Sequence, residues 1–184
     1  FEDQKYVGDP INAVRIYNEK QVDELMVIDI DATTEGREPN FEQIRNLAAE
    51  SRMPLCYGGG ITRAEQAAEI IALGFEKVSV SAAALDRPEL IHEMAELVGR
   101  QSVVVTIDVK KGGLLSGGHK VFSHNGTRKH NIKVGDFAAK AAELGAGEIV
   151  LNSIDRDGMM QGYDMALAKE IRARINTPLT VLGG

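Results

Sequence analysis

The amino-acid sequence predicts an α/β fold, a (β/α)8 TIM barrel built of two half-barrel repeats. Three observations point to it. Short apolar runs alternate strictly with longer amphipathic stretches along the 184 residues. The apolar runs are continuous, which is typical of parallel strands covered on both faces. The pattern of strands, loops and helices then recurs after 124 residues, as expected of a barrel made of two similar halves.

Six strand–helix units follow from this alternation, which predicts a parallel sheet. The predicted strands are ELMVIDI (24–30), PLCY (54–57), KVSVS (77–81), SVVVTIDV (102–109), EIVLNSI (148–154) and PLTVL (178–182). The predicted helices are 10–20, 40–51, 63–73, 88–99, 135–144 and 164–174.

Residues suited to capping support the ends of several helices. Asp9 supplies an N-cap with Pro10 at the first helical position, and Asp86 precedes Pro88 in a similar way. Gly74 and Gly145 follow the last turns of two other helices, where a left-handed residue ends a helix.

The repeat runs without a gap through a strand, its loop, a helix and the next strand. We therefore expect one domain over 1–184, with half-repeats of about 1–100 and 101–184 that hold strands two to seven of a barrel. A further echo sets the VGD at 7–9 against the VGD at 134–136. The pairs that coincide after 124 residues are Glu24 with Glu148, Asp31 with Asp155, Pro54 with Pro178, and Gly59-Gly60 with Gly183-Gly184.

The repeat also predicts strands that this sequence does not contain. The counterpart of 102–109 would lie before Phe1, and the counterpart of 77–81 would lie beyond Gly184. The sequence is therefore interpreted as truncated at both ends, and its open barrel edges would favour self-association.

Composition argues against several classes of function. The formal net charge of −6 argues against nucleic acid as a partner. Cys56 is the only cysteine, so an intrachain disulfide and a cysteine zinc site are excluded. The four histidines lack metal-ligand spacing, so no metal is expected. No run approaches 18 apolar residues and no signal peptide is recognisable, so we expect no membrane partner and a cytoplasmic location.

Glycines stand where three of the predicted strands end, at Gly58-Gly59-Gly60, Asp157-Gly158 and Gly183-Gly184. In a barrel this end of the strands carries the binding and catalytic groups. Glycine lets backbone N–H groups approach an anion, and a helix N-terminus adds partial positive charge. Tight turns use the same residues, but two symmetric copies favour two phosphate sites on opposite sides of one mouth.

Carboxylates follow several apolar strands, at Asp29, Asp31, Asp108 and Asp155. A carboxylate at such a position is costly unless it is paired, hydrogen-bonded or used for proton transfer. Asp108, in VVTIDVKKG, is the best candidate for a general acid or base. The alternative is a structural carboxylate that holds the lysine-rich loop. By the repeat, a partner acid belongs to the strand upstream of Phe1.

Three charged residues begin strands, at Glu24, Lys77 and Glu148. Strand starts gather at the opposite face of a barrel, where residues usually serve stability. On the residues alone, two acids and one base at this face indicate an ion-pair cluster.

The strand ends IDIDAT, YGGGI, TIDVKKG and NSIDRDG, together with LGAGEI and DRDGMMQGYD, carry a resemblance over essentially all 184 residues. The chain resembles the cyclase subunit of imidazole glycerol phosphate synthase. This implies a (β/α)8 barrel that receives ammonia from a glutaminase partner on its bottom face, with no metal or organic cofactor. The implied substrate is a bisphosphorylated aminoimidazole-carboxamide ribonucleotide. The products are imidazole glycerol phosphate, for histidine biosynthesis, and an aminoimidazole-carboxamide ribotide.

The resemblance also implies roles for particular residues. Asp108 matches one of two catalytic aspartates, and the other would lie upstream of Phe1. Ser81 ends a loop that reads Ser-Val-Ser here and usually reads Ser-Ile-Asn in the family. Gly59 and Gly60 match one phosphate site, Asp157, Gly158, Gly183 and Gly184 match the other, and Glu24, Lys77 and Glu148 match three of the four residues that gate the ammonia entrance, the fourth being an arginine.

Departures from the family pattern keep other functions open. Besides Ser81, Asp31 replaces the threonine of DITA and CYGGG replaces a more apolar lead-in. These features are similar to a paralogous branch that delivers ammonia for amidating an acetamido sugar in surface-polysaccharide synthesis. A phosphosugar isomerase barrel is a weaker match, since it usually reads DLDGA where this chain has DIDAT. A non-catalytic scaffold that conducts ammonia is the remaining alternative.

Overall fold

The computed structural model describes residues 8–113 and 118–184. The strands in these ranges are β1 (Leu25–Ile28), β2 (Leu55–Gly58), β3 (Lys77–Val80), β4 (Val103–Lys111), β5 (His119–Ser123), β6 (Arg128–His130), β7 (Glu148–Ser153) and β8 (Leu179–Leu182). They form one sheet, in which β1-β2-β3-β4-β7-β8 run parallel in that order. β5 and β6 form an antiparallel hairpin on the carboxyl half of β4.

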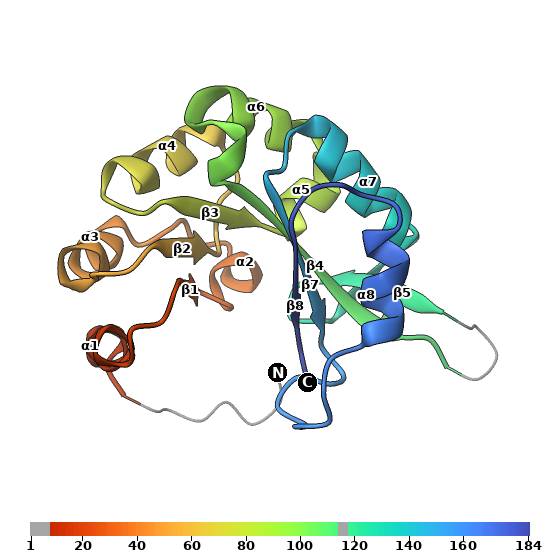
Figure 1. Cartoon of the computed structure of the whole chain (residues 1–184). Helices are drawn as coiled ribbons and strands as arrows, with labels where there is room; N and C mark the ends of the chain where they lie inside the picture. Colours follow the sequence, from red (N-terminus) through yellow and green to blue (C-terminus); the bar gives the residue numbers. More distant parts are fainter. Residues whose placement is uncertain (1–7, 114–117) are drawn as a thin grey trace.

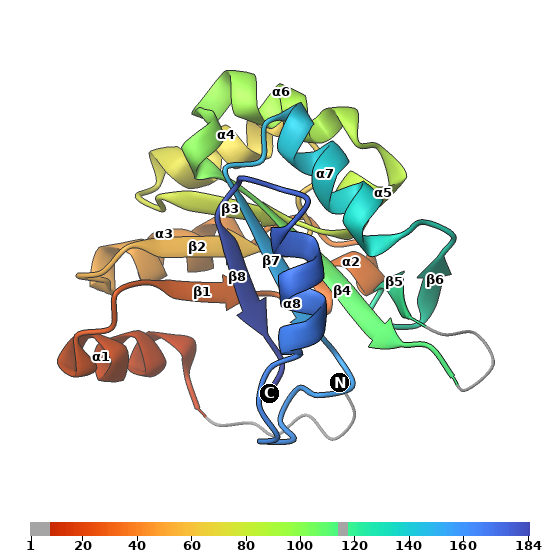
Figure 2. The same cartoon turned by 45° about the vertical axis from the view of Figure 1, so that its right-hand side comes forward.

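The helices cover the outer side of the curled sheet in an arc (Figure 1). The long helices are α1 (Pro10–Lys20), α3 (Phe41–Glu50), α4 (Ala64–Ala72), α6 (Glu89–Val98), α7 (Val134–Leu144) and α8 (Met165–Arg172). β1 and β8 are the first and last strands of the parallel row, and Figure 2 shows β8 in front and β1 beside α1. The predicted fold class is confirmed: this is an α/β chain with the strand order of a (β/α)8 barrel. Within the described ranges β1 pairs only with β2 and β8 only with β7, so the sheet is a half-barrel.

The strands are apolar throughout because both of their faces are buried. Side chains such as Val105 and Ile107 on β4 belong to the main core, which the outer helices close. Alternate positions point to the inner side of the curl. There, Cys56, Val104 and Val150 form a separate small cluster. One continuous apolar run on β4 therefore supplies side chains to both the main core and the inner cluster.

The sequence repeat has a direct counterpart in the backbone. Helices α1 and α7 have the same length of 11 residues and begin 124 positions apart. The backbone N–H of Leu25 donates to the carbonyl of Pro54 at 3.0 Å, and that of Ile149 donates to the carbonyl of Pro178 at 2.9 Å. The two halves therefore join equivalent strands through equivalent hydrogen bonds.

Two sequence-based interpretations are wrong. The VGD echo does not mark equivalent places, because Asp9 is the N-cap of α1 whereas Asp136 lies inside the first turn of α7; Val7 lies outside the described residues. Asp86 does not cap a helix with Pro88. It is the last residue of a short helix, α5 (Ala82–Asp86), and its carboxylate pairs with Arg128 instead.

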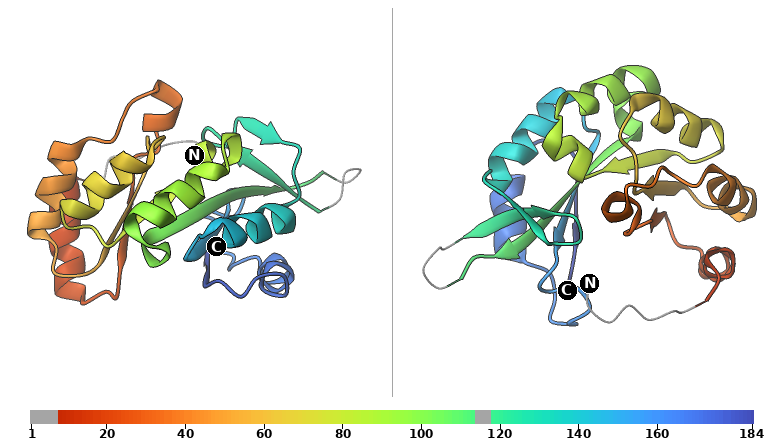
Figure 3. Two further views of the ribbon diagram at one scale, coloured as in Figure 1. Left: turned by 90° about the horizontal axis from the view of Figure 1, so that it is seen from above. Right: turned by 180° about the vertical axis from the view of Figure 1, so that it is seen from behind.

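Several short elements were not predicted. They are α2 (Ala32–Glu35), α5, the 3-10 turn η1 (Arg100–Ser102) and the β5–β6 hairpin. Figure 3 shows the hairpin standing out to one side of the curled sheet. The Asn125-Gly126 pair, between HKVFS and RKH, is a hairpin signal that could have revealed it. Among the described residues, no helix is both long enough and apolar enough to span a bilayer.

Candidate functional site

A cavity of about 270 Å³ opens at the carboxyl ends of the parallel strands. Residues from all six of these strands or from the loops that follow them line it. The predicted site residues in its lining are Gly59, Gly60, Ser81, Asp108, Asp157 and Gly183. Gly158 and Gly184 lie in the same loops but are not part of the lining.

Asp108 is the least solvated carboxylate of the cavity. Its neighbour in register on β7 is Asn152, whose Nδ2 donates to Asp108 Oδ1 at 2.8 Å. Burial raises the pKa of Asp108, and the hydrogen bond from Asn152 opposes this rise only in part. A carboxyl group with a raised pKa keeps a proton closer to neutral pH, which suits a general acid or base.

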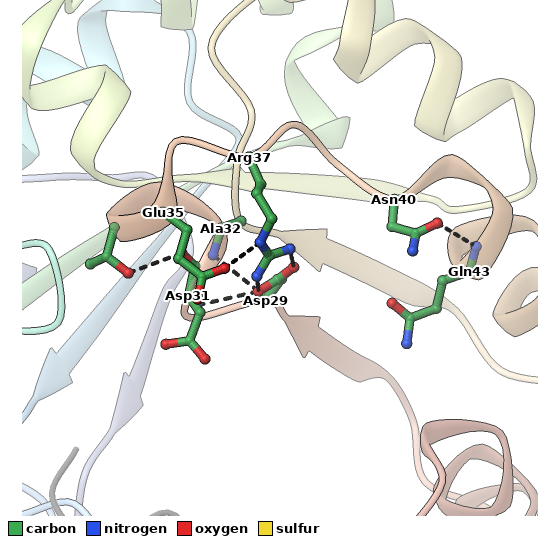
Figure 4. A network of polar contacts seen from close by, with 8 residues as sticks. Asp29, Asp31, Ala32, Glu35, Arg37, Asn40 and Gln43 are labelled. Atoms are coloured by element: carbon green, nitrogen blue, oxygen red, sulfur yellow. Dashed lines mark hydrogen bonds and ion pairs between the residues drawn. The ribbon is translucent and has the colours of Figure 1, made fainter.

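Asp29, the other strand-end acid in the lining, has a different environment (Figure 4). The Arg37 guanidinium donates to both of its oxygens, through Nη1 at 2.9 Å and Nη2 at 3.3 Å. The backbone N–H groups of Asp31 and Ala32 donate to Oδ1 at 3.2 and 3.0 Å. Four donors occupy this carboxylate, so Asp29 orders the loop after β1 instead of exchanging protons.

The glycines of the two loops are required by close backbone contacts. Gly59 has φ +112°, and a Cβ there would lie 2.3 Å from the carbonyl oxygen of Asp29. Gly183 has φ +80°, and a Cβ there would lie 2.3 Å from the carbonyl oxygen of Ser153. Each loop thus presents bare backbone to the cavity, which is what an anion site needs.

Hydroxyl groups also line the cavity. Ser79 Oγ and Thr106 Oγ1 are buried and lie 2.7 Å apart. Ser81 precedes α5, and its Oγ is buried without a hydrogen-bond partner. The sequence argument did not single out Thr106, which lies two residues before Asp108, or Asn152, which lies four residues after Glu148. Within the described ranges, no group of three His, Cys, Asp or Glu side chains is placed to hold a metal ion.

The hairpin adds residues to the cavity that the sequence argument left in an irregular loop. His124 and Asn125, at its turn, both line the cavity. They reach it because β5 pairs with β4 at the level of Asp108, which lies opposite Phe122. The sequence signal was the Asn125-Gly126 turn, which would have folded this segment back toward the strand end.

The three charged strand starts meet at the opposite end of the sheet. Lys77 Nζ lies 2.7 Å from Glu24 Oε2 and 2.9 Å from Glu148 Oε2. Thr180 Oγ1 donates to the second oxygen of Glu148 at 2.6 Å. Burial disfavours the Lys77 charge, but hydrogen bonds to the two glutamates outweigh it and raise the pKa of the ammonium group. Lys77 is therefore charged at neutral pH.

Comparison with known proteins assigns this architecture to a family. The sequence model of the family described as "Histidine biosynthesis protein" matches residues 1–184. The chain belongs to this family. Among the curated relatives, a protein of Leptospira interrogans named "Putative imidazole glycerol phosphate synthase subunit HisF" is 54% identical over the whole chain. A relative from Vibrio vulnificus (strain YJ016), with the same name except for the label hisF3, is 51% identical over the whole chain.

More distant members of the family carry the same subunit name. The imidazole glycerol phosphate synthase subunit HisF of Streptomyces avermitilis is 38% identical over all 184 residues. The chain spans 72% of the length of the Leptospira interrogans and Streptomyces avermitilis relatives and 70% of that of the Vibrio vulnificus relative. The family and the barrel-type strand order thus agree with the resemblance found in the sequence.

Proposed function

We propose that this protein is the cyclase subunit of an imidazole glycerol phosphate synthase, an enzyme of histidine biosynthesis. It uses ammonia, delivered by a glutaminase partner, to convert a bisphosphorylated aminoimidazole-carboxamide ribonucleotide to imidazole glycerol phosphate. The observation that carries the proposal is the cavity, where a buried carboxyl with a raised pKa lies between two glycine loops related by the repeat. The names of the relatives agree with this chemistry.

The two glycine loops are proposed to hold the two phosphates. Gly59 and Gly60 belong to the loop after β2, and Gly183 to the loop after β8. β2 lies near one end of the curled sheet and β8 forms the other end, so the two loops face each other across the cavity. A substrate with a phosphate at each end would span them, with its reacting centre beside Asp108. Asp157 and Ser81 lie in the lining near these loops and are proposed to position the ligand.

Asp108 is proposed to be the general acid or base of the reaction. Bond formation from ammonia nitrogen releases protons, and expulsion of a leaving group requires one, so the site needs a group that exchanges protons near neutral pH. The raised pKa of Asp108, caused mainly by burial, suits this task. Asp29 does not suit it, because Arg37 and two backbone N–H groups saturate its oxygens.

The cluster of Glu24, Lys77 and Glu148 is proposed to gate the entry of ammonia. On β3, Lys77 and Ser79 lie two residues apart and so face the same side of the sheet. Along the strands, the Cys56 cluster and the Ser79–Thr106 pair lie between the charged cluster and Asp108, and ammonia is proposed to pass them. The glutaminase partner would dock at this end of the strands.

The test uses the protein as its gene encodes it, with ammonium salts as the nitrogen source and the bisphosphorylated ribonucleotide as substrate. We expect turnover, followed by absorbance, in the native protein and a loss of at least a hundredfold in Asp108→Asn. Asp155→Asn is the matched control, because Asp155 also follows a strand but bonds the backbone of Lys111 outside the cavity lining. The raised pKa means that ionised Asp108 destabilises the fold above the ordinary carboxyl pKa of about 4, so Asp108→Asn should fold at least as well at pH 7.

Other outcomes of this experiment favour other functions. Ser81, where the family usually has an asparagine, favours the sugar-amidating branch together with Asp31 and the CYGGG lead-in, and its buried hydroxyl has no hydrogen-bond partner. A native protein that raises the rate of a glutaminase without cyclising the ribonucleotide would support that branch or a scaffold. Equal turnover by native protein and Asp108→Asn would contradict the proposed role of Asp108.

A further inference from the structure

A histidine at the hairpin turn faces the same cavity as Asp108. His124 and Asn125 line the cavity and have φ values of +52° and +55°. Residues other than glycine rarely adopt this left-handed conformation, and where they do the surrounding structure must hold them in it. Here the hydrogen bonds of the hairpin hold them, since the backbone N–H of Thr127 donates to the carbonyl of His124 at 3.1 Å. The turn therefore places His124 and Asn125 at the cavity at some cost in backbone strain.

The imidazole of His124 is held from behind by a serine and a second histidine. Ser123 Oγ lies 2.9 Å from Nδ1 of His124 and 2.7 Å from Nε2 of His130. Ser123 is 1% exposed, so water does not compete for its hydroxyl. Since Nδ1 of His124 is occupied, Nε2 is the ring nitrogen that remains for a ligand.

A single hydroxyl between two imidazoles couples their protons. A serine hydroxyl has one proton, so in the neutral state it donates to one ring and accepts from the other. If it donates to His124 Nδ1, that ring carries its proton on Nε2 and is a donor toward the cavity. If it donates to His130 Nε2, His124 carries its proton on Nδ1 and its Nε2 is a base. The two arrangements differ only in where the protons lie on the hydrogen-bonded groups of His124, Ser123 and His130.

We propose that His124 is a second acid–base residue of this cavity, and that Ser123 and His130 relay its protons. The proposal rests on the proposed function and adds a second proton-exchanging side chain to the cavity that Asp108 lines. A proton accepted at His124 Nε2 displaces the Nδ1 proton to Ser123. The serine proton then passes to His130 Nε2, and the half-buried His130 ring releases a proton to solvent from its Nδ1.

The surroundings of the relay favour a neutral His130 ring. Burial, and then the charge of Arg128, lower the pKa of His130, while Asp86 opposes them. Lys110 comes from β4, but its Nζ donates to the carbonyl of Gly126 at 2.9 Å and lies over the Phe122 ring. Asp108 faces the cavity from the same strand. A neutral relay can move in either direction, whereas a fully protonated one could only donate.

The first experiment tests the relay without any substrate. Nitrogen-15 NMR of the imidazoles, recorded against pH, is expected to show that the tautomer of His124 changes as His130 is protonated. Ser123→Ala should abolish this coupling. His130→Gln, which keeps a hydrogen-bonding side chain but cannot be protonated, should also fix the tautomer of His124. A His124 titration that is the same in native protein and in both variants would overturn the relay.

The second experiment tests the acid–base role of His124 with the ribonucleotide and ammonium salts. His124→Gly suits the left-handed backbone and is expected to lower kcat at least tenfold with little change in KM, and added imidazole should restore part of the loss. His92→Gln is the control, since His92 lies exposed on α6 outside the cavity lining. If the native protein turns over and His124→Gly is equally active, this inference fails and the proposed function stands. If the native protein does not turn over, the proposed function fails, and the NMR result still decides the relay.

Discussion

The loop after β1 and the loop after β7 share one backbone design. In each, a glycine from the loop after the next strand packs against the carbonyl at the strand end. Gly59 packs against the carbonyl of Asp29 and Gly183 against that of Ser153, and a Cβ added to either glycine would lie 2.3 Å from the carbonyl oxygen. Each loop also ends at a helix cap that accepts a hydrogen bond from the third residue of the helix. These pairs are Asn40 with the N–H of Gln43, and Asp164 with the N–H of Leu167, both at 3.0 Å.

The two loops differ in where they carry charge. In the first, the ion pair lies at the start, where Arg37 holds Asp29, and the cap Asn40 is neutral. In the second, the strand-end residue is Ser153, whose buried Oγ has no partner, and the charge lies at the end. There Asp164 Oδ2 bonds His119 Nε2 at 3.0 Å and lies 3.8 Å from Arg156 Nε.

This difference teaches which features of a repeat are constrained. The glycines and caps are fixed by backbone sterics and by the hydrogen bonds of the helix ends, so both halves keep them. The side chains that tie each loop down are free to diverge. The first loop is tied to itself by Arg37. The second loop is tied by His119 to the hairpin, and thereby to the segment that carries His124 into the cavity.

The largest expected loss of stability comes from adding a Cβ where a glycine packs against a strand-end carbonyl. Gly59→Ala and Gly183→Ala should each lower the free energy of unfolding by about 3 kcal/mol, because a left-handed alanine is strained and its Cβ overlaps a carbonyl. Urea denaturation would measure this. Gly158→Ala is the control, since Gly158 also has positive φ but no atom within 4 Å of an added Cβ, and about 1 kcal/mol is expected. Equal costs at all three positions would mean that the carbonyl contacts contribute nothing.

Breaking the cluster that joins the halves should have the next largest effect. Glu24 and Glu148 are equivalent in the repeat, and Lys77 pairs with both. Lys77→Met leaves two facing carboxylates and should lower the free energy of unfolding by about 2 kcal/mol. Because the pKa of Lys77 is raised, its contribution is fully present below about pH 10 and is lost only as the pH rises through the folded value. A cost that varied between pH 6 and 8 would contradict this assignment; Glu24→Gln, which leaves the Glu148 pair, should cost less.

Removing the charge at the end of the second loop should have a smaller effect. Asp164→Asn keeps the cap but loses the charge that His119 and Arg156 share, and should lower the free energy of unfolding by about 1.5 kcal/mol at pH 7. Although burial opposes it, the hydrogen bonds from Leu167 and His119 lower the pKa of Asp164. Its contribution is therefore present above about pH 4 and is lost as the pH falls through the folded value. Thermal unfolding should show a smaller difference in stability between native protein and Asp164→Asn at pH 3 than at pH 7. Asn40→Asp, with no such cation bonded to the cap, should change little.

The sequence predicted what depends on periodicity and missed what depends on local pairing. All six parallel strands and six long helices were predicted, because apolar runs and amphipathic stretches report burial directly. Gly59 and Gly183 were singled out because the repeat places them at equivalent strand ends, and Asp108 because a carboxylate at the end of an apolar strand is costly unless it is paired or used. The hairpin was missed because its strands are short and polar. Asn152 belongs to the site because it bonds Asp108, which is distant in sequence, and His124 because the hairpin turn brings it to the cavity. Neither relation leaves a periodic pattern in the sequence.

The smallest effect is expected where the first loop is tied down. Arg37 is 46% exposed, so Arg37→Gln should change the free energy of unfolding less than any of the destabilising changes above, because solvent screens an exposed ion pair. The same change leaves the carboxylate of Asp29 without a cation beside the cavity, so inorganic phosphate, measured by calorimetry, should bind severalfold more weakly. Arg37→Lys keeps the charge but loses the two-pronged geometry, and should fall between native protein and Arg37→Gln. Unchanged phosphate binding in Arg37→Gln would mean that the charge at the start of this loop does not reach the anion. The two loops would then differ in their anchoring alone.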